Sequence, residues 1–387
     1  MKKRLVWLDM AKGAAIVLMV LGHCLDSSTS ARAFVYSFHM PLFFVLAGFT
    51  MHAKPRKQVL ATSFRRLLVP YFAVSAVLLF FAFVPPSSIS SSLDTQRSAA
   101  VVIGEIAFAS GQEGTFLGFS YQAIGALWFL PCLFVARLVL NEILLLGERV
   151  RSTLAQRTVL SIGASAKTSL PAICANACEA GCAATALLLG FAIGNVMRLP
   201  FDVDTALVAV GFMHIGYVTK KIGIERIPDA LFVLLAIIWL QYPAAGNNEM
   251  AIRAYLDNPW SIATAVAGSL VVMRLCMSLA KAPILAKALA WCGIYSLSIL
   301  CVHRIESAVL NWQKVMEFFR PDVWGWSVTA QGFYQFGLRI AFVITFAVLA
   351  HLAAKSIRAA LADARAKRSG ADGNAAGQRA FAAPKGM

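Results

Sequence analysis

The chain has 387 residues, of which 59% are hydrophobic and 14% are charged, and its formal net charge at pH 7 is +16. A soluble domain has about 45–50% apolar and about 25% charged residues, so this composition excludes an ordinary soluble protein. The apolar residues fall into runs of roughly 20, which is long enough to cross a bilayer. The basic residues cluster between these runs, which favours membrane topology over nucleic-acid binding.

The sequence therefore predicts an all-α, polytopic membrane protein with about ten transmembrane helices, cytoplasmic N- and C-termini and no nucleic-acid partner. In chain order, we expect the helices at about residues 5–25, 34–52, 67–84, 124–146, 170–196, 204–219, 228–245, 260–280, 288–305 and 331–355. This orientation places most of the 35 Lys and Arg residues inside, as the positive-inside rule requires.

We expect residues 1–355 to form one transmembrane domain and residues 356–387 to form a basic, disordered cytoplasmic tail. Residues 87–123 form a long outer segment that begins with a Ser-rich stretch and continues with an apolar run too short to span the membrane. This segment is expected to lie on the outer face or to dip into it. Its fold is not readable from the sequence.

The eight cysteines lie in apolar segments or at their ends and do not resemble a disulfide framework. Cys174, Cys178 and Cys182 recur every four residues and so share one helix face. Their spacing is not that of common zinc sites, and they are expected to let helices approach closely. We predict no metal site.

The first apolar segment carries three ionisable residues, Asp9, Lys12 and His23. At about 100° per residue, all three fall on one stripe of a helix. Because lipid disfavours such a stripe, it should face protein or a water-filled cleft, and intramembrane ionisable residues are functional candidates by default. The alternative, an Asp9–Lys12 ion pair that holds helices together, is equally open.

A second histidine, His39, follows a short outer loop and is close to Pro41. We expect His23 and His39 to lie at similar depth near the outer face, beside a helix that the proline breaks. Two imidazoles in such a place suit general acid–base catalysis. The alternative is that each histidine only forms a hydrogen bond between helices.

Arg65 and Arg66 stand just before a predicted helix, at its inner mouth, where guanidinium groups suit phosphate recognition. The neighbouring residues 54–57 are better explained as a topogenic cluster or a lipid-headgroup contact. Three weaker candidates are His303 and Glu113, both expected on the outer side, and Trp128, which is typical of an interfacial anchor.

Together these stretches resemble the acyltransferase 3 family of integral-membrane acyltransferases, and most closely the subgroup typified by fucose 4-O-acetylases. The resembling stretches cover about residues 4 to 305 in the order of the family. They are Leu8-Asp9-Met10-Ala11-Lys12-Gly13 with Gly22-His23, Phe38-His39-Met40-Pro41 with Phe43-Phe44, Arg65-Arg66 with Pro70-Tyr71, Leu127-Trp128-Phe129-Leu130, Gly211 to Gly216, and Tyr295-Ser296 to His303.

The resemblance implies a ten-helix enzyme that takes an acyl group, usually acetyl from acetyl-CoA, at the cytoplasmic face. It delivers this group to a hydroxyl of a cell-envelope glycan at the outer face of the bacterial cytoplasmic membrane. The resemblance also implies that His23 is catalytic, that Lys12 is essential, and that Arg65 and Arg66 contact acyl-CoA. The chain departs from the family in having Lys12 where many relatives have arginine, and in having adjacent arginines.

A rival hypothesis is a proton-coupled transporter or a glycan-lipid flippase, in which Asp9, Lys12 and the histidines form a proton relay. Such transporters often contain inverted repeats, and none is visible in the sequence. The acceptor sugar, the acyl group and the choice between monomer and homodimer are not readable from the sequence.

Overall fold

The computed structural model describes residues 5–83, 98–162, 169–246, 248–319 and 324–381, and the side chains at all of these except 158–162, 354, 357, 358 and 361–381. The model is 81% helical with almost no sheet. Within the described residues, seven helices are long and apolar enough to cross a membrane, or nine if each of two bent pairs is one span. The prediction of an all-α, multi-pass membrane protein is confirmed, whereas the count of ten and the cytoplasmic termini stay predictions.

The first half of the chain contains the elements α1 (Val6–Gly22), α2 (Ser30–Tyr36), α3 (His39–Phe49), α4 (Arg56–Ser63), η1 (Phe64–Leu68), α5 (Val69–Phe81), α6 (Ala99–Phe108), β1 (Gly114–Phe116), β2 (Phe119–Tyr121), η2 (Gly125–Trp128), α7 (Phe129–Ile162) and α8 (Leu170–Val196). The second half contains η3 (Pro200–Asp202), α9 (Val203–Ile222), η4 (Ile224–Arg226), α10 (Asp229–Trp239), α11 (Tyr242–Ala245), η5 (Met250–Ile252), η6 (Ala254–Leu256), α12 (Trp260–Leu279), α13 (Pro283–Ile294), α14 (Ser296–Val309), α15 (Trp312–Phe319) and α16 (Val328–Phe381).

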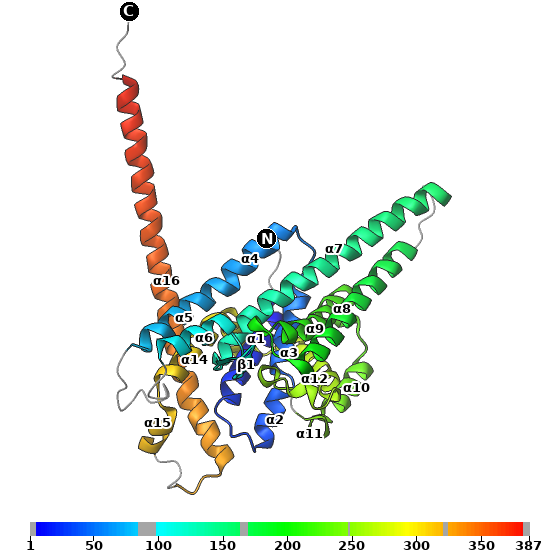
Figure 1. The fold of residues 1–387 in the computed structure, drawn as a ribbon, viewed down its shortest axis with the longest axis horizontal. Helices are drawn as coiled ribbons and strands as arrows, with labels where there is room; N and C mark the ends of the chain where they lie inside the picture. The colour runs from blue at the N-terminus through cyan, green and yellow to red at the C-terminus, as the bar shows by residue number, and fades with distance from the viewer. Residues whose placement is uncertain (1–4, 84–97, 163–168, 247, 320–323, 382–387) are drawn as a thin grey trace, which may run out of the picture.

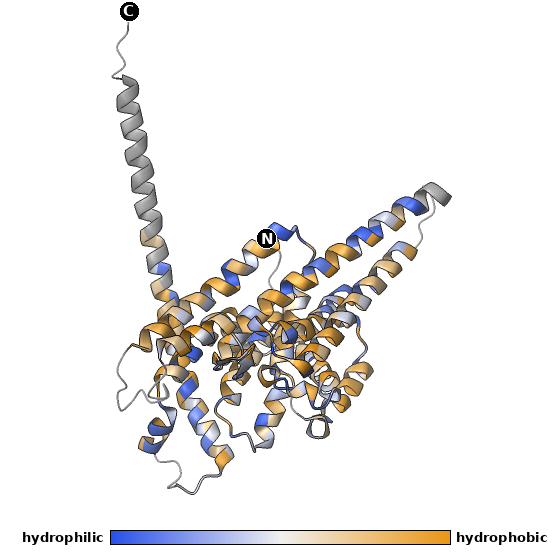
Figure 2. Cartoon of the chain, in the orientation of Figure 1, coloured by the Kyte–Doolittle hydropathy of each residue, from blue (hydrophilic) through white to orange (hydrophobic). Residues whose placement is uncertain are grey.

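The helices gather around α1 and α3, which lie at the centre of the molecule (Figure 1). α1 packs mainly against α13, and α3 packs mainly against α9. The far ends of α7 and α16 project on one side, whereas α2, α11 and α15 lie on the other (Figure 1). Hydrophobic residues dominate the central parts of the helices, and hydrophilic residues gather toward the projecting end of α7 and in α15 (Figure 2).

Part of the predicted outer segment lies within the described residues. Its apolar run forms α6, which has 10 residues and is too short to span, as expected. It is followed by an antiparallel hairpin in which Gly114 pairs with Tyr121. The two residues of its tight turn, Leu117 and Gly118, both have positive φ, as the favoured two-residue hairpin turns require. The Ser-rich stretch at 87–92 lies outside the described residues.

The second predicted helix counts as one span, Ser30–Phe49, but contains a short break. The chain breaks between α2 and α3 at Ser37 and Phe38, so that His39 is the first residue of α3. Pro41 is the third residue of α3, where its missing N–H needs no partner because the first turn of a helix has none. Pro41 therefore lies in the first turn of α3, where a proline is tolerated, and it does not interrupt a helix in the middle.

The ninth predicted helix is also broken. α13 and α14 meet at an angle of 68° on either side of Tyr295. The tenth begins at Val328, and its backbone continues to Phe381, past the predicted end at residue 355. The domain boundary at 355 and the disorder of the tail stay predictions.

Close helix contacts depend on glycine. A Cβ atom on Gly48 would lie 1.8 Å from the carbonyl oxygen of Met213, and one on Gly216 would lie 1.9 Å from that of Val45. These glycines bring α3 and α9 together backbone to backbone, as small residues do in membrane proteins. The pair Gly13 and Gly293 does the same for α1 and α13. The helices that carry Lys12, His23 and His39 are thereby packed closely against their neighbours.

We expect Gly48→Ala to lower the free energy of unfolding by about 1–3 kcal/mol, because the added methyl group must push α3 away from α9. Gly181→Ala is the matched control, since a Cβ there would meet nothing within 4 Å and alanine favours a helix by about 0.5–1 kcal/mol. Thermal melting of both variants in detergent checks this. Equal melting temperatures would contradict it.

Candidate functional site

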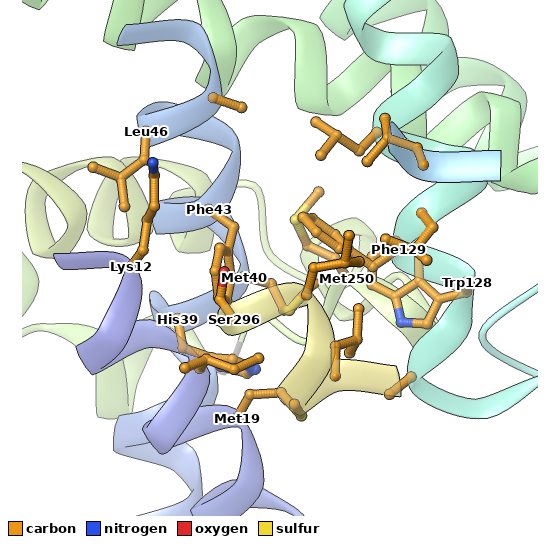
Figure 3. A pocket seen from close by; sticks show the side chains of 18 of the residues that line it. Lys12, Met19, His39, Met40, Phe43, Leu46, Trp128, Phe129, Met250 and Ser296 are labelled. Atoms are coloured by element: carbon orange, nitrogen blue, oxygen red, sulfur yellow. The ribbon is translucent and has the colours of Figure 1, made fainter. Parts of the chain in front are cut away.

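A cavity of about 540 Å³ lies between α1, α3, α7 and the bend at α13–α14. It is lined by all three predicted catalytic residues, both predicted cofactor-binding arginines and one of the weaker candidates. These are Lys12, His23, His39, Arg65, Arg66 and Trp128. Figure 3 shows Lys12 beside Leu46 at one side and Trp128 beside Phe129 at the other. The eleven residues between Lys12 and His23 correspond to about 16 Å along α1, so the cavity follows the helix for roughly half of a 30 Å hydrocarbon core.

Lys12 lies on the wall of this cavity while its neighbour Asp9 lies beneath it. The Nζ atom of Lys12 is 3.7 Å from Oδ1 of Asp9, and the Lys12 side chain is 31% exposed against 8% for Asp9. An Asp9–Lys12 ion pair is therefore present within α1, and it does not remove Lys12 from the cavity. That this pair holds helices together and that Lys12 acts in the reaction stay predictions.

Arg65 and Arg66 belong to a helical segment instead of a loop. α4, η1 and α5 run on as one span from Arg56 to Phe81, and η1 is a single π-helical turn. Pro70 has no N–H to give to the carbonyl four residues earlier, so the regular ladder is interrupted here. Such π turns recur at functional sites, and this one directs both arginines to the cavity.

Arg137 is a further cation on the cavity wall, from α7. Its Nε donates to Oγ of Ser63 at 3.1 Å. Arg137 lies one helical turn from Asn141, whose side chain pairs with the backbone of Lys54 just after α3. We call the part of the cavity lined by Lys12, Arg65, Arg66 and Arg137 the basic end.

The opposite part of the cavity holds His23, His39 and Tyr36, and we call it the histidine end. The ring of Tyr36 is 4.8 Å from that of His39 and 6.4 Å from that of His23. His23 caps the last turn of α1, and its exposed surface faces the cavity. The two imidazoles thus border one space, on either side of a phenol.

The tautomer of His39 follows from its surroundings. Its Nδ1 is 2.9 Å from the carbonyl oxygen of Val35, in the last turn of α2. That carbonyl lacks a helical partner because the chain breaks after α2, and a carbonyl can only accept. Nδ1 therefore carries the proton, which leaves a lone pair on Nε2 of the neutral ring.

An ion pair borders the histidine end. Arg32 on α2 lies 3.3 Å from Glu249, which lines the cavity, and the Arg32 guanidinium stacks on Tyr36 at 4.5 Å. A second, buried cluster fixes the neighbouring loops, because Arg253 bonds both Asp202 and Asp204. Of the charged residues that line the cavity in the described chain, the four at the basic end are cations and Glu249 is the acid.

Trp128 is 4% exposed and lines the cavity, so it is not placed as a lipid-facing anchor. Gly111 makes room for it, since a Cβ there would lie 2.9 Å from the indole. Glu113 is exposed on the loop before β1 and is not among the residues that line the cavity. His303 is buried outside the cavity, with its ring 5.1 Å from that of His23.

The sequence comparison decides the family. Residues 5–352 match the model of the acyltransferase 3 family, which is described as an acyltransferase domain. The chain belongs to this family. No curated protein and no solved structure matches the chain.

As an acyltransferase 3 protein, the chain is a membrane acyltransferase. The matched region includes every residue that lines the cavity. The family match thus gives the class of reaction, and the cavity brings four cations together with two histidines. Sequence reasoning gave no role to Arg137, Tyr36 and Glu249.

Proposed function

We propose that this protein is an O-acetyltransferase of the bacterial cytoplasmic membrane, which moves an acetyl group from cytoplasmic acetyl-CoA to a hydroxyl of a cell-envelope glycan. One observation carries the proposal: a single cavity joins a cluster of cations to a pair of histidines. An acyltransferase whose donor and acceptor lie in different compartments needs such a passage. The resemblance to the fucose 4-O-acetylase subgroup supports a sugar hydroxyl as the acceptor.

The basic end suits an anionic donor. Lys12, Arg66 and Arg137 approach it from three different segments, α1, η1 and α7. Guanidinium groups bind phosphate through charge-assisted, bidentate hydrogen bonds, and acyl-CoA carries several phosphates. With the predicted cytoplasmic orientation of this side, the basic end faces the compartment that contains acyl-CoA.

The histidine end suits a neutral polyol. The pair formed by Arg32 and Glu249 has no net charge, and the indole of Trp128 adds a flat apolar face to the wall of the same cavity. Carboxylate oxygens accept hydrogen bonds from hydroxyl groups. We therefore assign the acceptor to this end.

In the transfer, His23 removes the proton of the acceptor hydroxyl as that oxygen bonds to the carbonyl carbon of the acyl group. The bond between that carbon and sulfur breaks, and His23 returns the proton to the leaving thiolate, so that an ester and a free thiol result. His39, with its lone pair on Nε2, is the second base within the same space. Lys12 stabilises negative charge on the donor side.

Inverted membrane vesicles with labelled acetyl-CoA outside and glycan acceptor inside test the proposal. We expect release of free thiol and label in the glycan at equal rates. A transporter or a flippase would release no thiol, and that result would overturn the proposal. Mass analysis of surface glycans from cells with and without the gene identifies the acceptor.

A further inference from the structure

A buried polar cluster lies behind His23, outside the cavity. It consists of His303 and Glu306 on α14, Trp312 on α15 and Arg339 on α16. The side chains of His303, Glu306 and Arg339 are 2%, 1% and 7% exposed, and the cluster is not among the residues that line the cavity. Donor and acceptor binding, as proposed above, do not involve it.

Glu306 is the centre of the cluster. Its Oε1 accepts from Nε of Arg339 at 2.7 Å, and its Oε2 accepts from the indole N–H of Trp312. Nδ1 of His303 is 2.8 Å from Oε1. The angle between the two groups is not that of a hydrogen bond, so this contact is electrostatic. Because a carboxylate attracts a proton donor, Nδ1 of His303 carries the proton, and Nε2 keeps a lone pair in the neutral ring.

Two members of the cluster contact His23. The ring of His303 lies 5.1 Å from the ring of His23, tilted by 39°. Arg339 donates from Nη1 to the backbone carbonyl of His23 at 3.3 Å. His23 is the C-cap of α1: its N–H still donates to the carbonyl of Met19, whereas its own carbonyl is one of those that the end of a helix leaves without a helical partner. The cluster therefore forms a hydrogen bond to the backbone of His23 and lies against its imidazole.

A static ion pair explains only part of this arrangement. Glu306 and Arg339 neutralise each other and connect α14 with α16, which is sufficient for a structural bridge in the membrane. Such a bridge needs no histidine. A buried, polar His303 between the carboxylate and His23 would serve packing less well than leucine would. Its place is that of the third group that orients a catalytic base.

We propose that His303, held by Glu306, is a positioning residue that orients the imidazole of His23 for proton transfer. The inference rests on the proposed function, in which His23 moves the proton between acceptor and leaving group. Arg339 completes the arrangement by fixing the carbonyl of His23. His303 touches neither substrate, so its effect is on the rate of transfer and not on binding.

The test compares His303→Leu with His303→Gln in the full-length protein. We expect kcat for acetyl transfer to fall about 10- to 100-fold with leucine and by less than about fivefold with glutamine, whose amide places a polar group near the position of Nε2. KM for acetyl-CoA and the melting temperature should stay unchanged. A packing role predicts that leucine is tolerated at least as well as glutamine. His214→Leu is the control, since His214 is a buried histidine away from the cavity.

If the His303→Leu protein does not insert into the membrane, two other variants test the inference. They are Glu306→Gln and the double variant Glu306→Gln/Arg339→Gln. The single variant leaves a buried cation, whereas the double variant is again neutral. A static bridge predicts that the double variant regains both melting temperature and kcat. Our inference predicts that it regains melting temperature alone. Full kcat in either His303→Leu or the double variant would overturn the inference, whereas an inactive wild type would overturn the proposed function itself.

Discussion

Replacement of His23 by alanine is expected to abolish acyl transfer, with a loss of at least about 100-fold and up to about 10,000-fold, the range for a positioned general base. The physical reason is that His23 faces the cavity at the end of α1, within 5.1 Å of one imidazole ring and 6.4 Å of a phenol ring. Acetylation of acceptor glycan in inverted vesicles measures the effect. Protein amount and melting temperature should stay unchanged.

His52→Ala is the matched control for this variant. His52 is exposed just beyond α3 and is not among the residues that line the cavity. It should retain full activity. Full activity of His23→Ala would remove His23 from the mechanism, and His39→Ala would then test the other imidazole as the base.

Replacement of Arg137 by glutamine should raise KM for acetyl-CoA about 10- to 100-fold and change kcat much less. A hydrogen bond to a charged group contributes about 1.5–3 kcal/mol, and about 1.4 kcal/mol corresponds to a factor of ten. Arg137 lies on the cavity wall of α7 and is held by Ser63. Initial rates over a range of acetyl-CoA concentrations give the two constants.

Two controls separate donor binding from packing. Arg149→Gln removes an exposed arginine of the same helix that does not line the cavity, and its KM should equal that of the wild type. Ser63→Ala removes only the hydrogen bond that holds Arg137, and its effect on KM should be smaller than that of Arg137→Gln. An unchanged KM in Arg137→Gln would show that the donor phosphates bind elsewhere.

The architecture was readable from the sequence because apolar runs and basic links obey simple rules. Hydropathy did not reveal the breaks after α2, α10 and α13, since both halves of each span are apolar. The 68° bend lies next to Gly293, which packs against the backbone of Asp9, a contact between segments far apart in the chain. The break after α2 depends on His39 satisfying a carbonyl of the preceding helix.

Two signals made part of the site readable: an ionisable residue that interrupts an apolar run, and the basic link that holds Arg65 and Arg66 before one. The first signal selected Lys12 and His23, and it applies equally to Arg137 and Arg339, which also lie within long helices. These two received no role because their partners are remote in sequence. Arg339 meets Glu306 33 positions away, and Arg137 meets Ser63 74 positions away. One sequence does not show such pairings, which arise from helix packing.

The residues in the middle of the cavity bear on whether protons can leak across the membrane. On α1, Ile16 and Met19 separate Lys12 from His23, and Phe43 and Phe129 also line the cavity. Apolar constrictions exclude water when they are empty. In the transfer that we propose, the thioester arm of the donor would lie along this apolar part of the wall, which disfavours hydrated protons and ions. We therefore expect the acyl group to cross without a leak of protons through the same cavity.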